Sequence, residues 1–240
     1  MRRRITWSAT CRAAGLGLVT LFATACASFP AERMPKVDEV PSQQRFPNKP
    51  SVYVPLRFTV DLSGGENPAR EVTTPLPMLR QAVERIAAEA ALFRSLTFES
   101  FQAKDVDHVL QIDLTNYGSA GKAAAAGFIT GLTLFLVPTA ATDNYKLTAK
   151  LFDANGQLLR TYSYDDAITT WLGMWLLAVA GKTPKSAAEG VWENMIRTLY
   201  SDIVNDGLLR YSESPRERRD WRLHIAAAPQ SEVAVADSGD

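Results

Sequence analysis

The side chains best able to do chemistry are the acidic and histidine residues at 105–108. Asp105, Asp107 and His108 stand together there, a combination that could bind a metal ion or act as an acid–base pair. A zinc site of the usual kind needs further histidines or cysteines at fixed spacing. The one other histidine of the chain, His224, is far away in the sequence. We therefore expect a polar loop that enters a strand here, with no metal site and no catalytic site.

Other short motifs lack the neighbours that their chemistry requires. Asp165 and Asp166 resemble a pair of catalytic carboxylates, but adjacent residues of a strand point to opposite faces and do not easily share a proton. The glycines at 64–65 and 118–121 lack the lysine and the serine or threonine of a phosphate-binding loop, and no Gly-x-Ser-x-Gly sequence marks a nucleophilic serine. We expect no enzyme activity and no cofactor.

Cys26 is the one residue whose setting indicates a covalent modification. Three arginines follow Met1, an apolar stretch runs from Ala13 to Ala25, and small residues occupy 23–25, directly before the cysteine. A positive start, a short apolar core and a small-residue cleavage site form a secretory signal. The apolar run is well short of the roughly 20 residues that span a bilayer. We therefore expect residues 1–25 to be a cleaved signal peptide.

The sequence Ala23-Thr24-Ala25-Cys26 resembles the lipobox of bacterial lipoproteins. This resemblance covers residues 1–26, and it implies cleavage before Cys26 and attachment of fatty acids such as palmitate to the new N-terminus. It also implies the periplasmic face of the outer membrane, because Ala27 stands where an aspartate would resemble an inner-membrane retention signal. An ordinary secretory signal, which would leave Cys26 as a free thiol, is the alternative.

Composition limits the partners of the mature chain. Cleavage removes four arginines and no acidic residue, so the net charge falls from zero to −4 over the remaining 215 residues. A mildly acidic chain is a poor candidate for binding nucleic acid. Cys26 would be its only cysteine, which excludes a disulfide within the chain. With 46% hydrophobic residues, an apolar core can supply the stability instead.

The two ends of the mature chain differ from its middle. Five prolines among polar residues at 26–50 predict an extended tether between lipid and body. Residues 212–240 are charged and then rich in alanine, serine and aspartate, which indicates a mobile tail. A single folded domain is expected over 51–211.

Periodicity predicts the strands of this domain. Residues 52–62 are rich in β-branched and aromatic residues, and apolar and polar residues alternate at 56–62, 96–101 and 109–114, as in half-buried strands. Two further alternating runs at 145–152 and 157–164 enclose Asn155-Gly156, which predicts a β-hairpin with a type I′ turn.

Two helices are also expected. Leu79, Val83, Ile86, Ala90 and Phe93 recur at helical spacing, and residues 184–205 repeat the pattern after Thr183 and before Gly207. The order of elements indicates an α+β fold, with a mostly antiparallel sheet and both helices packed on one face.

Two apolar segments, 123–141 and 167–181, do not belong to these elements. They could be core of the domain, elements at the membrane interface with Trp171 and Trp175 at headgroup depth, or, for 123–141, a spanning helix. The core interpretation is narrowly favoured. Gly127 and Gly131 have a spacing that permits close helix packing and self-association.

The expected function follows from the envelope location and the lack of catalytic motifs. The element order over about 51–210 resembles small α/β domains of envelope lipoproteins, such as the activators of penicillin-binding proteins and the curli-secretion lipoprotein. This resemblance implies a non-catalytic module that binds an envelope protein or copies of itself. A hydrolase or transglycosylase that acts on the cell wall is the alternative.

Overall fold

The structure, a computed structural model, describes residues 26–61, 69–118, 120–133, 136–173 and 183–212. The predicted signal peptide and nearly all of the predicted tail lie outside these residues. The elements in chain order are β1 (Cys26–Pro30), β2 (Ser51–Tyr53), β3 (Leu56–Asp61), β4 (Arg70–Glu71), α2 (Leu76–Glu89), β5 (Ser95–Thr97), the 3-10 helix η1 (Ser100–Asp105), β6 (His108–Tyr117), α3 (Ala120–Leu132), β7 (Thr139–Asp153), β8 (Leu158–Leu172) and α4 (Pro184–Asn205). The α+β class predicted from the sequence is confirmed.

The sheet is mixed, whereas a mostly antiparallel sheet was predicted. Its eight strands include the path β1-β8-β7-β6-β2-β5, with β3 beside β6 and β4 at the edge of β3. The hairpin strands β7 and β8 and their neighbours β6 and β1 are antiparallel. Strands β2 and β3 instead run parallel to β6, because α2 lies between these strands in the chain and carries it back across the sheet.

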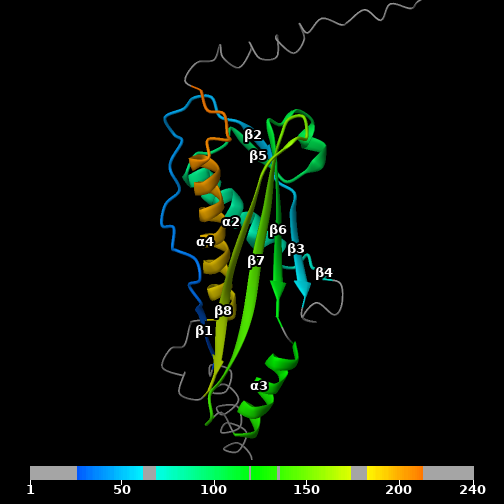
Figure 1. The fold of residues 1–240 in the computed structure, drawn as a ribbon, viewed down its shortest axis with the longest axis vertical. Helices are drawn as coiled ribbons and strands as arrows, with labels where there is room; N and C mark the ends of the chain where they lie inside the picture. Colours follow the sequence, from blue (N-terminus) through cyan, green and yellow to red (C-terminus); the bar gives the residue numbers. More distant parts are fainter. Residues whose placement is uncertain (1–25, 62–68, 119, 134–135, 174–182, 213–240) are drawn as a thin grey trace, which may run out of the picture.

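Helices α2 and α4 cover one face of the sheet, as predicted (Figure 1). Leu79, Val83, Ile86 and Ala90 of the predicted stripe are buried. Helix α4 has the predicted bounds, and the Thr183 hydroxyl caps it by accepting a hydrogen bond from the Ser186 amide. Between the helices and the sheet, the Trp192 ring packs against Phe58 and Tyr145, with centroids 5.5 and 5.6 Å away.

The predicted hairpin is confirmed, but its turn is not type I′. A type I′ turn needs positive φ at two residues, and here only Gly156 has one (φ 78°). The Asp153 amide donates to the Gln157 carbonyl and closes a three-residue loop. The Asp153 carboxylate also accepts bonds from the amides of Asn155 and Gln157. A type I turn that ends in a left-handed glycine fits this pattern.

The segment predicted as a tether lies against the body. Its first five residues are β1, and beyond them the chain (blue in Figure 1) runs beside α4. The Val37 amide donates to Asn194 of α4, and the Gln43 amide donates to the carbonyl of Ala90 after α2. Val40 is 7% exposed. The backbone of 31–50 is mostly irregular, as its prolines favour, but it does not separate Cys26 from the body.

The two apolar segments also differ from the predictions. Segment 123–141 divides into most of helix α3, a short connection and the first three residues of β7. In segment 167–181, residues 167–172 are the end of β8, and 174–181 lie outside the described residues. Figure 1 shows α3 at the same end of the molecule as β1 and the end of β8, far from the hairpin turn.

Candidate functional site

Cys26 is the first residue of β1 and lies at one end of the sheet. It is opposite Leu172 in β8, and Leu172 is opposite Thr139 at the start of β7. Neighbouring strands lie about 4.8 Å apart, so Cys26 is about 10 Å from the first residue of β7. Its side chain is partly exposed, as the attachment of a lipid to Sγ requires. Burial raises the pKa of the unmodified thiol, which makes it a poor nucleophile.

Helix α3 packs beside the start of β7 with its more polar side. Thr130 is 1% exposed, and its hydroxyl is hydrogen-bonded to that of Thr139. Both hydroxyls also donate to the carbonyl of Ala126. A surface helix of a globular protein normally turns its apolar side inward. In α3 that arrangement is reversed, because threonine hydroxyls make the contact with the sheet.

The large apolar side chains of this end point away from the body. Of the nine large hydrophobic residues that are exposed in the described part of the chain, six belong to α3, the connection after it and the end of β8. We call these six the apolar cap: Phe128 (67% exposed), Ile129 (48%), Leu132 (69%), Leu136 (55%), Val137 (48%) and Trp171 (43%). The core interpretation of 123–141 is therefore wrong for α3 and its connection. Single exposed hydrophobic side chains are normal on a soluble protein, but six grouped at one end require an explanation.

The apolar cap surrounds the end of the sheet on both faces. Thr139 bonds to α3, so α3 lies on the face to which Thr139 points. Trp171 is paired with Ala140, and side chains alternate along a strand, so Trp171 lies on the opposite face. The other candidate interface residue, Trp175, lies outside the described residues. Ala167 and Ile168, earlier in the same predicted segment, are buried in the way the core interpretation requires.

Charge is scarce around the apolar cap. Lys122 is the only charged residue from 120 to 142, and neither 26–31 nor 167–172 contains one. The first acidic residue along β7 is Asp143, four residues or about 13 Å from Thr139. Burial raises the pKa of the Asp143 carboxyl. The strand ends and the helix that form this end of the sheet therefore carry little charge near Cys26 and α3.

The Asp107 and His108 region has a structural role. The Asp107 carboxylate accepts hydrogen bonds from the amide and hydroxyl of Ser51, at 2.7 and 2.8 Å, and so holds the start of β2. His108 is 6% exposed, and burial lowers its pKa. Asp105 ends η1. Within the described residues, no group of three or more histidine, cysteine or acidic side chains could hold a metal ion.

Asp165 and Asp166 point to opposite faces, as predicted for neighbours in a strand. Asp165 accepts a 3.0 Å bond from the Tyr117 hydroxyl. Asp166 is 2% exposed and accepts bonds from the amides of Arg33 and Ala167. These two carboxylates hold β6, β8 and the start of the 31–50 segment together, and they do not form a pair.

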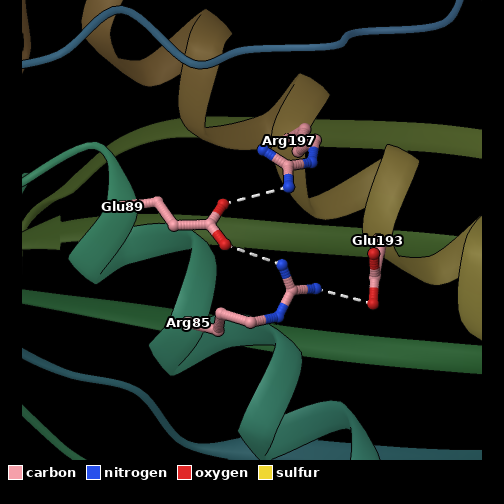
Figure 2. Close-up of polar contacts among 4 residues, drawn as sticks. All are labelled: Arg85, Glu89, Glu193 and Arg197. Atoms are coloured by element: carbon pink, nitrogen blue, oxygen red, sulfur yellow. Dashed lines mark hydrogen bonds and ion pairs between the residues drawn. The ribbon is translucent and has the colours of Figure 1, made fainter.

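A second polar cluster lies between α2 and α4 (Figure 2). Arg85 bridges Glu89 at 2.8 Å and Glu193 at 2.6 Å, and Arg197 bridges Glu89 at 3.0 Å. Hydrogen bonds from Arg85 and Arg197 lower the pKa of Glu89. Beside this cluster is a cavity of about 180 Å³, lined in part by Met78, Arg85, Trp192 and Glu193.

This cluster is poorly suited to acid catalysis. A general acid needs a carboxyl whose pKa is raised toward neutrality, whereas Glu89 is ion-paired and has a lowered pKa. The four charges pair α2 with α4 across the helix interface. No sequence pattern indicates this cluster, because its residues come from two helices more than 100 positions apart.

Among the described helices, none is both long and apolar enough to cross a bilayer. Comparison with protein families and with curated proteins finds no match to this chain.

Proposed function

We propose that this chain is a non-catalytic lipoprotein of the cell envelope, held at the periplasmic face of the outer membrane by a lipid on Cys26. One observation carries the proposal. The residue that the lipobox resemblance selects is the first residue of β1, partly exposed, at the uncharged end of the sheet. A lipid attached there needs no rearrangement of the body to reach a membrane.

The anchored body would stand on the membrane on the end that carries Cys26. Strand β8 runs from Leu158 to Leu172, which is about 45 Å at 3.3 Å per residue. Since β1 joins the anchor directly to β8, the hairpin turn would be held at about that distance from the membrane. A lipoprotein of this kind presents its far end at a fixed height, where an envelope protein can bind it.

The far end offers the other exposed apolar side chains. Leu158 and Leu159 follow the hairpin turn, and Phe101, 69% exposed, lies in η1. Helix η1 packs beside β2 and β5, and β6 begins opposite Asp153 at the hairpin. We place the contact with the protein partner in this region. A photo-reactive amino acid at position 159 should cross-link a partner in intact cells, whereas one at the exposed Lys185 should not.

Labelling with radioactive palmitate tests the anchor. The chain should incorporate the label and fractionate with the outer membrane. Cys26→Ser should abolish the labelling and cause the precursor to accumulate, because the processing that follows lipidation needs the modified cysteine. Equal labelling of the wild type and of Cys26→Ser would refute the proposal. Ala27→Asp is a poor test of sorting, because Ala27 is fully buried opposite Trp171 and a charge there would disturb the fold.

A further inference from the structure

We propose that the apolar cap is a second membrane contact, inserted among the lipid chains of the leaflet that holds the anchor of Cys26. The choice of leaflet rests on the proposed function, whereas insertion is inferred from the exposed side chains of the cap. The binding partner of the cap is thus a lipid bilayer. The lipid would bring the body to the membrane, and the cap would fix its orientation there.

The reversed arrangement of α3 is the first argument. Its buried residue Thr130 hydrogen-bonds to Thr139 of β7 and to the carbonyl of Ala126, whereas Phe128, Ile129 and Leu132 project outward. In water this arrangement loses the hydrophobic stabilisation that normally holds a helix on a domain. Among lipid chains it is favourable, because polar groups are satisfied internally and apolar side chains meet an apolar solvent.

The distribution of the cap on both faces of the sheet is the second argument. A protein partner with one binding surface would cover α3 or Trp171, but they lie on opposite faces. A fluid leaflet closes around the whole strand end. The partly exposed indole ring of Trp171 could also lie in the headgroup region of the membrane, where tryptophan is enriched.

Proximity to the anchor is the third argument. Cys26, Leu172 and Thr139 are neighbours across three strands, and Trp171 is adjacent to Leu172. A lipid on Cys26 therefore holds this end of the sheet at the membrane surface. No acidic residue from 120 to 142 opposes entry, and the first one, Asp143, is half-buried farther along β7.

A depth measurement in the lipidated full chain tests the insertion. Cys11 leaves with the signal peptide and lipid occupies Cys26, so an introduced cysteine would be the only free thiol. The two labelling positions are Ile129→Cys and Leu159→Cys, at opposite ends of the molecule. The wild-type side chains there are comparably exposed, at 48% for Ile129 and 37% for Leu159. Each would carry an NBD fluorophore in vesicles of phosphatidylethanolamine and phosphatidylglycerol. Nitroxide-labelled lipid should quench the probe at 129 severalfold more than the probe at 159.

A second test removes the lipid. The mature chain, residues 26–240 with Cys26→Ser, should still float with the same vesicles. Replacing Phe128, Ile129 and Leu132 together by serine should weaken this binding about tenfold or more, because interfacial binding scales with buried apolar area. The matched control, Leu158→Ser with Leu159→Ser, should bind like the parent. Circular dichroism verifies that each variant is folded.

The outcomes separate the two proposals. If 129 stays as accessible to water as 159, or if the triple variant floats like its parent, the cap is not a membrane contact. The probe at 129 could instead be shielded from water in the absence of lipid, in a dimer that the triple substitution abolishes. In that case a second copy of the chain covers the cap, and the inference is overturned. If palmitate labelling fails while the unlipidated chain binds vesicles through the cap, insertion stands and only the anchor at Cys26 is refuted.

Discussion

Cys26 and Leu172 are cross-strand partners at the end of the sheet. Many polar linkers let an anchored domain move freely, but here hydrogen bonds of β1 fix the cysteine to the longest strands of the fold. A lipid on Cys26 would therefore be connected rigidly to β8, and through β8 to the hairpin at the far end. The position of such an anchor would then determine how the body stands on a membrane.

Trp171 and Trp192 provide a first prediction, because they test which tryptophan belongs to the core. Trp171 is 43% exposed, and Trp192 is 4% exposed and packs against Phe58 and Tyr145. In the unlipidated chain in water, Trp192→Ser should reduce the free energy of unfolding by about 3–5 kcal/mol. Trp171→Ser should cost about 1 kcal/mol or less.

Denaturant unfolding followed by circular dichroism measures both values. Equal losses for the two variants would mean that Trp171 is covered by the protein itself. Such a result would remove it from the apolar cap.

Gly156 provides a second prediction, about the hairpin turn. Its φ of 78° is strained for a β-branched residue, and no atom lies within 4 Å of the place that a Cβ would take. Gly156→Val should therefore destabilise the body by about 1–2 kcal/mol through backbone strain alone. Gly156→Asn should cost clearly less, because asparagine tolerates the left-handed region. Thermal melts of both variants test this, and an unchanged melting temperature for the valine variant would contradict the turn geometry.

His108 provides a third prediction, about pH. Burial lowers its pKa in the folded state, so below about 6.5, the usual value of histidine, the unfolded chain binds a proton that the folded chain does not. Stability should consequently fall as the pH drops below about 6.5, until the folded pKa is reached, by up to roughly 1.4 kcal/mol per pH unit. Asp107, Asp153 and Arg210 influence this titration.

His108→Gln should flatten that part of the profile. Urea unfolding of both proteins between pH 7 and pH 5 measures the difference, which isolates His108 from other titrating groups. Parallel profiles for the two proteins would contradict the account.

The sequence predicted those elements in which apolar residues recur with a clear helical or strand period. The stripe of α2, the full length of α4 and the hairpin of β7 and β8 all show such patterns, and all are present. The mixed sheet was missed because strand direction depends on the crossover through α2, which a local pattern does not encode. The turn type was missed because Asp153, one residue before the loop, supplies its side chain to the turn.

The candidate site was predictable only in part. The resemblance of residues 23–26 to a lipobox pointed to Cys26, and composition pointed to the apolar segment that contains α3. The orientation of α3 could not be predicted, since nearly every face of 120–132 is apolar and the deciding contact is between Thr130 and Thr139. The close packing of 26–50 was hidden for a similar reason, because its backbone groups pair with Asn194 and Ala90, which are far away in sequence.

The lipid anchor is tested most directly by the intact mass of the protein extracted from its own membrane, with fragmentation of its N-terminus. We predict a chain that begins at Cys26 and carries the mass of attached acyl chains on that residue, and we predict that Cys26→Ser yields no such species. A mature chain with an unmodified thiol on Cys26, whether it begins at Cys26 or at another residue, would contradict this prediction. In that case neither the anchor nor the rigid attachment of the body to the membrane through β1 would hold.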